Sequence, residues 1–210
     1  MRPKNLSIPD NILCVAAVKY ATLEEILPII EEGFTTLGWS TVQQFRKLSK
    51  ILPQNCRHHF IGYLQKNKVN QLVLSDIDLI HSIDRMDLID TLAGAAQSKS
   101  KIQHILLQVK TDVIKEHGFT YKEIDELFPS LLTKQSLSVK GLMTIPPLVD
   151  DPEENRHIYK EMREFRDSLE QKYHVTLPSL SMGMSSDYKI AIEEGATMIR
   201  LGRILFGKEV

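Results

Sequence analysis

The sequence predicts an α/β fold with a parallel sheet, and a (β/α)8 TIM barrel in particular. Eight short apolar or β-branched runs alternate with segments whose apolar residues recur at helical spacing. The chain has 210 residues, 42% of them hydrophobic, which suffices for one sizeable core. Because no repeat, low-complexity tract or Pro/Gly-rich linker divides the chain, we expect residues 1–210 to form a single domain, with 1–10 as a short amino-terminal extension. An open doubly wound sheet is the alternative, since 210 residues is short for a barrel.

The strands and helices are predicted from these runs in order. The strands are expected near residues 12–18, 34–38, 58–62, 77–82, 102–109, 138–143, 178–182 and 197–201. The apolar stripes that indicate helices lie within residues 23–30, 42–52, 124–131 and 158–169. A capping box, Thr22-x-x-Glu25, opens the first helix, which Gly33 closes, and a second box, Thr120-x-x-Glu123, opens the third.

The charge pattern excludes several classes of protein. The 26 Lys and Arg residues balance 27 Asp and Glu residues, whereas nucleic-acid-binding proteins usually carry a basic excess. Residues 153–174 mix both signs, as in a solvated helix face. No apolar run approaches the roughly 20 residues of a membrane span, and no signal peptide is evident. Cys14 and Cys56 lack C-x-x-C spacing, and Cys14 is expected to be a buried structural thiol. We therefore expect a cytoplasmic protein that binds neither nucleic acid nor membrane.

The loops after the seventh and eighth predicted strands are candidates for a phosphate site. Small or hydroxyl-bearing residues follow the seventh strand at Ser181, Gly183, Ser185 and Ser186. Gly202 follows the eighth strand, where it would let the backbone approach a ligand closely. In (β/α)8 barrels these two loops often bind phosphate through backbone N–H groups. Either loop alone is typical of an ordinary turn, with Ser186 or Asp187 capping a helix, but the pair favours a bound phosphate.

Arg200 lies near the end of the eighth predicted strand. Because alternate residues of a barrel strand face inward, Arg200 is expected to face away from its apolar neighbours Ile199 and Leu201. A buried guanidinium is unfavourable unless something accepts its hydrogen bonds. A carboxylate of the protein is one possible acceptor, and a ring nitrogen or phosphate of a ligand is the other.

Lys19 stands at the end of the apolar run "ILCVAAVKYA", which forms the first predicted strand. When a barrel closes, its first strand lies beside its eighth, so Lys19 is expected near the phosphate site. Partial burial and the cation of Arg200 would lower the pKa of the Lys19 amine from about 10.4 and make it nucleophilic. A lysine within reach of a phosphate-bearing aldehyde describes a pyridoxal phosphate (PLP) site. The alternative is a lysine that merely extends into water at a strand end.

Several motifs resemble one known family. The stretch "HFIGYLQKNKVNQL" at residues 59–72 resembles the signature His-Phe-Ile-Gly-x-Leu-Gln-x-Asn-Lys of the pyridoxal phosphate homeostasis proteins. These proteins are single-domain relatives of the alanine racemase N-terminal barrel. Further matching motifs occur in the expected order, and they are "HSIDR" at 81–85, "GLMTIP" at 141–146, "LSMGMSSD" at 180–187 and "RLGRILFG" at 200–207.

The resemblance implies roles for five residues. Lys19 corresponds to the lysine that holds PLP as an internal aldimine, and Arg200 to an arginine facing the pyridine nitrogen. Ser181 and the backbone around Gly202 and Arg203 match the phosphate cradle. His59 is expected near the cofactor without an assigned role. The resemblance implies neither a catalytic residue nor a metal.

Two segments depart from the family pattern. Val18 and Tyr20 flank Lys19 where the family has Ser and Thr. After the second strand the chain reads Gly38-Trp39-Ser40 where the family has Gly-Glu-Asn, which removes polar groups expected near the ring. Trp39 could shield the cofactor instead, or simply pack in the core. Only about ten residues precede the first strand, where the family usually has a helix.

The resemblance implies a PLP carrier in vitamin B6 homeostasis without a defined turnover reaction. Apo PLP enzymes are the expected recipients, and we expect a monomer, although no sequence feature fixes the oligomeric state. The first alternative is an amino-acid racemase, which needs a second acid/base that alanine racemases take from a separate domain. The second is a degenerate barrel that has lost PLP and acts as an interaction protein. A barrel enzyme acting on a phosphorylated metabolite is the third, and it lacks an inward acid/base pair.

Overall fold

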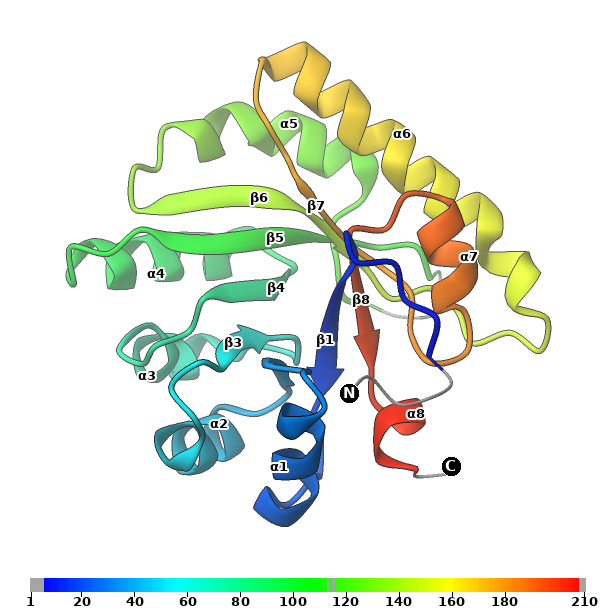
Figure 1. The fold of residues 1–210 in the computed structure, drawn as a ribbon. Helices are drawn as coiled ribbons and strands as arrows, with labels where there is room; N and C mark the ends of the chain where they lie inside the picture. The colour runs from blue at the N-terminus through cyan, green and yellow to red at the C-terminus, as the bar shows by residue number, and fades with distance from the viewer. Residues whose placement is uncertain (1–5, 113, 115, 208–210) are drawn as a thin grey trace.

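The structure is a closed barrel of eight parallel strands in sequence order, each followed by helical connections (Figure 1). It is a computed structural model that describes residues 6–112, 114 and 116–207. The first and last strands pair from Leu13 opposite Met198 to Ala16 opposite Leu201. The predicted (β/α)8 barrel is therefore confirmed, and the open sheet is wrong because this pairing leaves no free edge.

Every predicted strand overlaps an observed one. The strands are β1 (Leu13–Ala17), β2 (Thr36–Trp39), β3 (Arg57–Phe60), β4 (Leu79–Ile83), β5 (Gln103–Val109), β6 (Leu137–Thr144), β7 (Ser179–Ser181) and β8 (Met198–Leu201). The α-helices are α1 (Leu23–Glu31), α2 (Val42–Leu48), α3 (Val69–Val73), α4 (Met86–Gln97), α5 (Tyr121–Leu132), α6 (Arg156–Tyr173), α7 (Tyr188–Glu193) and α8 (Arg203–Phe206). Short 3-10 helices are η1 (Ser49–Ile51), η2 (Lys66–Lys68) and η3 (Pro152–Asn155).

Both predicted capping boxes are present. The Glu25 carboxylate accepts the Thr22 backbone N–H at 2.7 Å, and α1 ends two residues before Gly33, whose φ is +99°. At α5, Glu123 accepts the Thr120 N–H at 2.7 Å and its own N–H donates to the Thr120 hydroxyl at 3.2 Å. These bonds satisfy backbone donors that would otherwise lack partners at a helix start.

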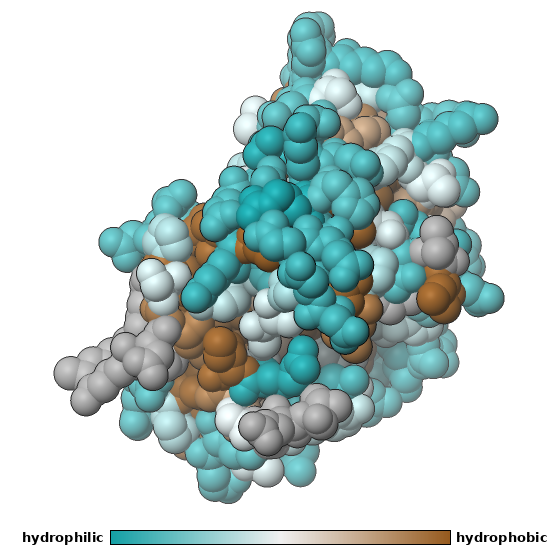
Figure 2. Space-filling view, turned by 90° about the vertical axis from the view of Figure 1, so that its right-hand side faces the viewer, coloured by the Kyte–Doolittle hydropathy of each residue, from teal (hydrophilic) through white to brown (hydrophobic). Residues whose placement is uncertain are grey.

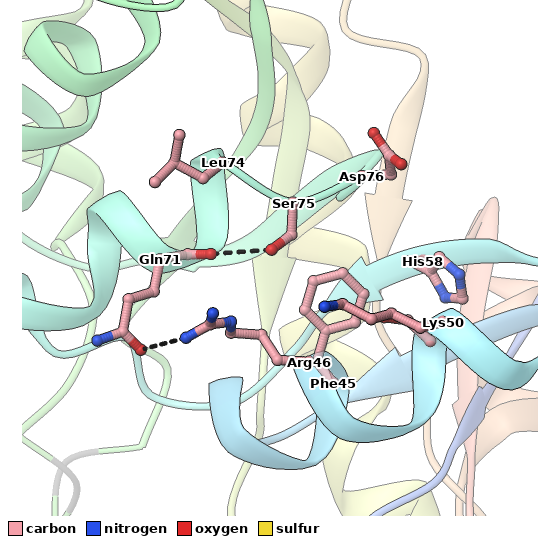
Figure 3. A pocket seen from close by; sticks show the side chains of 9 residues that line it. Phe45, Arg46, Lys50, His58, Gln71, Leu74, Ser75 and Asp76 are labelled. Atoms are coloured by element: carbon pink, nitrogen blue, oxygen red, sulfur yellow. Dashed lines mark hydrogen bonds between the residues drawn. The ribbon is translucent and has the colours of Figure 1, made fainter.

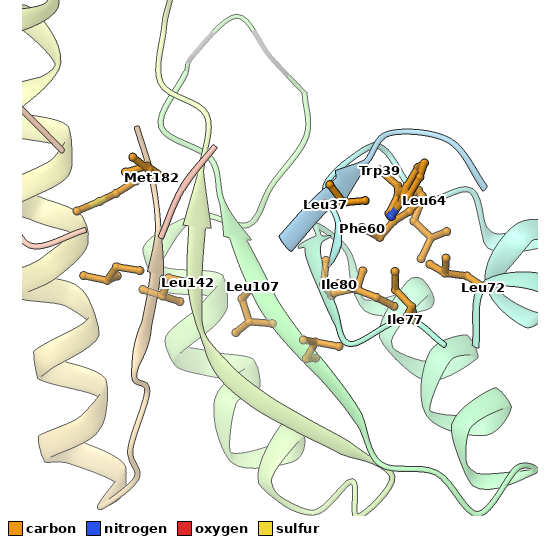
Figure 4. Packing of buried hydrophobic residues seen from close by; sticks show 14 of the residues in the cluster. Leu37, Trp39, Phe60, Leu64, Leu72, Ile77, Ile80, Leu107, Leu142 and Met182 are labelled. Atoms are coloured by element: carbon orange, nitrogen blue, oxygen red, sulfur yellow. The ribbon is translucent and has the colours of Figure 1, made fainter. Parts of the chain in front are cut away.

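The main core lies between the outer face of the barrel and the helices. Figure 4 shows Trp39 and Phe60, from neighbouring strands, packed with Leu64 and Leu72 beside α3. A second, smaller cluster of Leu79, Leu106 and Met143 is separate from it. Leu79 pairs in register with His59, and Met143 with Ser181. Because residues in register on adjacent strands point to the same face, this second cluster fills the barrel interior together with those polar residues.

The exterior carries the mixed charges that the sequence predicts for residues 153–174. Arg156 in α6 pairs with Glu153, Glu193 and Glu194 at 2.7 to 2.9 Å, which ties α6 to η3 and α7. Hydrophilic side chains cover much of the face that Figure 2 shows, with apolar patches between them. No helix among the described residues has the length and apolarity to cross a membrane.

The expected amino-terminal extension is described from residue 6 onward. Residues 6–12 contain no helix. Residues 1–5 of the extension lie outside the described residues.

Candidate functional site

Arg200 points into the barrel, as the strand alternation predicts. One guanidinium nitrogen, Nη1, donates to the Ser181 carbonyl at 2.8 Å and to the Ser181 hydroxyl at 2.7 Å. The other, Nη2, donates to the Thr144 carbonyl at 2.7 Å. In the described part of the chain, no carboxylate forms an ion pair with Arg200. Burial lowers the pKa of Arg200 to about 10, so the group stays charged at neutral pH. The barrel thus holds a buried cation on uncharged acceptors.

Two buried histidines extend this network across the barrel. The His81 Nδ1 atom lies 2.9 Å from the Ser181 hydroxyl, and His81 Nε2 lies 3.0 Å from His59 Nδ1. Burial lowers the pKa of His59 to about 4, and burial together with the charges of His59 and Arg200 holds the pKa of His81 well below 6.5. Both rings are therefore neutral at pH 7, with one N–H each. The hydrogens of the chain from Ser181 to His59 must then all point the same way along it.

The loops after β7 and β8 meet beside this network. Gly183 has φ of +90°, and a Cβ there would lie 2.6 Å from the Ala191 Cβ, so only glycine fits. A Cβ at Gly202 would lie 3.3 Å from the Ala17 carbonyl oxygen, which brings this loop against the end of β1. The Ser185 hydroxyl faces the Ile204 N–H at 3.4 Å, a long distance for a hydrogen bond. These loops therefore offer a hydroxyl and a weakly engaged backbone donor.

The predicted phosphate residues occupy different positions in this arrangement. Ser181 is fully buried, and its hydroxyl already contacts Arg200 and His81. Arg203 is exposed as the first residue of α8, directly after Gly202. Asp187 precedes α7 as predicted for a cap, but its carboxylate accepts the Met184 N–H at 2.7 Å. The loop hydroxyl that faces α8 is thus that of the half-buried Ser185 rather than that of Ser181.

Lys19 lies two residues beyond the end of β1, in a turn. Its side chain is exposed, and Nζ lies 4.8 Å from the centre of the Tyr20 ring. The expected partial burial of Lys19 is wrong, because β1 ends at Ala17 and the turn, with Tyr20 at φ of +63°, carries the chain outward. Val15 pairs with Arg200, so four residues separate Lys19 from that level. At about 3.3 Å per residue, Lys19 lies at most about 13 Å beyond the level of Arg200 along the direction of the strand.

Gln44 holds the turn that carries Lys19, a role that no sequence pattern indicated. The Gln44 side-chain amide donates to the Val18 carbonyl at 2.9 Å and to the Ala21 carbonyl at 3.1 Å. The two bonds bracket Lys19 and connect the turn to α2. Gln44 follows the Gly38-Trp39-Ser40 stretch, in which the sequence departs from the family that it resembles.

Trp39 belongs to the core and not to the site. It is fully buried on the outer face of β2, contacts Phe45 at 5.7 Å between ring centres, and donates its indole N–H to His58 Nδ1 at 3.1 Å. The idea that Trp39 shields a cofactor is therefore wrong. In a strand, the residue after inward-facing Gly38 must point outward.

The remaining candidate groups contribute no site. Cys14 and Cys56 form no disulfide, and Cys14 is half-buried rather than buried as expected. No group of three His, Cys, Asp or Glu side chains among the described residues could hold a metal ion.

Comparison with known proteins places the fold and these motifs in one family. The family described as "Alanine racemase, N-terminal domain" matches residues 8–210. The chain belongs to this family. A pyridoxal phosphate homeostasis protein of Aquifex aeolicus is 40% identical over 196 residues, which cover 92% of this chain and 86% of that protein. One from Synechocystis is 35% identical over 96% of this chain and 93% of its own length.

Solved structures agree with this assignment. PipY of Synechococcus elongatus PCC7942, solved with PLP bound, is 32% identical, has a TM-score of 0.86, and is matched over 95% of this chain and 94% of its own. An alanine racemase of Clostridium difficile, 14% identical, gives a TM-score of 0.78 over 96% of this chain and 54% of that chain. At that identity the likeness concerns the fold alone.

Proposed function

We propose that this protein binds PLP at the carboxyl-terminal end of its barrel and serves in vitamin B6 homeostasis. The observation that carries the proposal is the buried Arg200, whose guanidinium has no carboxylate partner in the described chain and is held by Ser181 and Thr144. The pyridoxal phosphate homeostasis proteins and the PLP-bound PipY that this chain resembles support the same conclusion. When bound, PLP supplies an aldehyde that condenses with an amine, and a phosphate that anchors it.

The described residues fit this cofactor at both of its ends. Arg200 has only donors and remains protonated, so it would hold the ring nitrogen of PLP by donating a hydrogen bond and could not protonate it. Lys19 provides the primary amine beyond the end of β1, on a turn that Gln44 fixes. For the phosphate we assign the Ser185 hydroxyl, the backbone after Gly202 and the charge of Arg203. Ser181, assigned to the phosphate from sequence, instead orients Arg200.

The same proposal covers the cellular role. A ring nitrogen left unprotonated makes a weak electron sink, which suits storage and transfer of PLP better than turnover. Apo PLP enzymes in the cytoplasm are the recipients that we propose, and the two cysteines without a disulfide are typical of a reducing compartment.

The test is a visible absorption spectrum of the purified protein with and without added PLP. We expect a band that borohydride removes, and that is lost in Lys19→Ala but kept in Lys47→Ala, which changes an exposed lysine of α2. A protein that shows no band at saturating PLP would contradict the proposal. A robust alanine racemisation rate, lost in Lys19→Ala, would instead establish the enzyme alternative.

A further inference from the structure

A cavity of about 360 Å³ lies at the amino-terminal end of the barrel, away from the proposed PLP site (Figure 3). Its walls come from α2 and η1 on one side and from the end of α3 on the other. His58, the second residue of β3, lies between these walls, and Asp76 precedes β4. Arg200 and Gly202 lie at the opposite, carboxyl-terminal end of their strand. Pockets for small molecules commonly enclose roughly 300 to 1,000 Å³.

His58 presents a single fixed donor in this cavity. Its side chain is 8% exposed, and its Nδ1 accepts the Trp39 indole N–H at 3.1 Å. Burial lowers the pKa of His58, so the ring is neutral and its proton resides on Nε2. Within the described residues, Nε2 donates to no protein acceptor. The Nε2–H is therefore free to donate to water or to a ligand that enters the cavity.

Two cations stand on the wall formed by α2 and η1. Arg46 and Lys50 are exposed, and neither forms an ion pair with any described residue. Arg46 Nη1 lies 3.5 Å from the Gln71 side-chain oxygen, at the limit of a hydrogen bond (Figure 3).

The acidic group of the cavity, Asp76, has its own cationic neighbour. Lys101 donates to the carbonyls on either side of Asp76, those of Ser75 and Ile77, at 3.4 and 3.3 Å. Burial lowers the pKa of Lys101, and the nearby charges of Asp76 and Asp78 oppose this effect. Two cationic side chains, Arg46 and Lys50, and one carboxylate, Asp76, line the cavity, so the balance of charge favours an anion.

Apolar side chains complete the lining. The buried Phe45 ring lies between the two walls, and Leu74, 61% exposed, lies on the α3 side (Figure 3). A ligand that fits both the charges and these side chains has an anionic head and an apolar body.

We propose that this cavity binds a small organic carboxylate with an apolar body. The carboxylate accepts hydrogen bonds from His58 Nε2–H, Arg46 and Lys50, while the body packs on Phe45 and Leu74. Trp39, which departs from the family sequence, fixes the His58 tautomer that the ligand requires. An inorganic phosphate would satisfy the donors and leave the apolar side chains exposed, so it is the weaker ligand.

The test is calorimetric titration of the protein with 4-methylpentanoate, 4-methylpentanamide and inorganic phosphate. We expect saturable binding of the carboxylate and at least about tenfold weaker binding of the neutral amide, which lacks the charge. Arg46→Met and Lys50→Met each weaken carboxylate binding about tenfold. Lys47→Met, which changes a lysine of α2 that does not line the cavity, leaves carboxylate binding unchanged. Equal affinity in all three variants, or phosphate binding more tightly than the carboxylate, overturns the proposal.

Two further measurements make the result specific to this cavity. Lys19→Ala leaves carboxylate binding unchanged, so the outcome is independent of whether PLP binds. Long-range ¹H–¹⁵N spectra of His58 show the Nε2–H tautomer, with Nε2 shifting on titration, and Trp39→Phe weakens both the tautomer preference and the affinity. A His58 signal that does not move at saturation overturns the proposal even if Trp39→Phe fails to fold.

Discussion

The barrel interior contains two sets of side chains that differ in how they are stabilised. Leu79, Leu106 and Met143 form an apolar cluster that is held by packing alone. Across the same interior, Ser181 and Arg200 belong to a hydrogen-bonded chain that continues into the two histidines. The apolar cluster needs no hydrogen-bond partners. In the polar chain, by contrast, losing one member leaves a buried donor or acceptor without a partner, which destabilises the fold. The polar set therefore marks the part of the barrel interior where a ligand site, rather than apolar packing, determines the side chains.

The largest expected effect concerns the apolar cluster. Leu106→Ala removes a fully buried side chain and leaves a cavity, so we expect the free energy of unfolding to fall by about 2 to 5 kcal/mol. Urea unfolding measures it, with Leu132→Ala, at a half-exposed position, as the control. Because Leu106 forms none of the hydrogen bonds of the polar chain, we expect the folded variant to keep the PLP absorption band. Loss of that band at unchanged stability would show that the two sets are not separable.

The polar chain predicts a loss of stability in mild acid. The pKa of His59 is about 4 in the folded protein and about 6.5 in an unfolded chain, so the unfolded state binds the proton first as pH falls. Stability is thus complete above pH 6.5 and decreases towards pH 4, by about 3 kcal/mol for this group. His81 acts in the same direction. Urea unfolding across this range should show a shallower slope in His59→Gln and an unchanged one in His157→Gln, an exposed control.

Ser181→Ala breaks the polar chain at its centre. The change leaves an Arg200 N–H and His81 Nδ1 without their shared partner, which costs about 1 to 3 kcal/mol of unfolding free energy. PLP affinity falls as well, because Arg200 loses one of the groups that orient it. Unfolding and PLP titration measure both effects, with the exposed Ser168→Ala as control. Unchanged PLP affinity would mean that Ser181 does not position Arg200.

The smallest effect lies outside the barrel interior. Gln44→Leu removes two hydrogen bonds to the turn that carries Lys19, from a half-buried position. We expect about 1 kcal/mol or less in stability, and a several-fold slower appearance of the PLP absorption band in stopped-flow mixing. An exposed change on the same helix, Gln43→Leu, should leave both unchanged. A rate equal to that of the unaltered protein would show that the turn is held without Gln44.

Local sequence patterns were sufficient to predict the barrel and the inward direction of Arg200. Strand alternation determines which way Arg200 points, and capping boxes such as Thr120-x-x-Glu123 mark helix starts, because both depend on residues close together in the chain.

The partners of these side chains depend on register and could not be predicted. His81 hydrogen-bonds to Ser181, one hundred residues away in the chain, and Gln44 of α2 donates to the Val18 carbonyl in the Lys19 turn. Neither pairing leaves a local signal. The expected burial of Lys19 was wrong because β1 ends at Ala17, one residue before the end of the predicted strand, and the chain then turns outward.

The pairing of β1 with β8 also bears on when the site comes into existence. Val15 and Arg200 are partners across the seam of the barrel, yet one is made near the start of synthesis and the other near its end. A contact of such long range forms late and slowly. A nascent chain that still lacks β8 therefore has neither the Arg200 guanidinium nor a closed barrel. The proposed PLP site is therefore complete only after β8 has been made and has paired with β1.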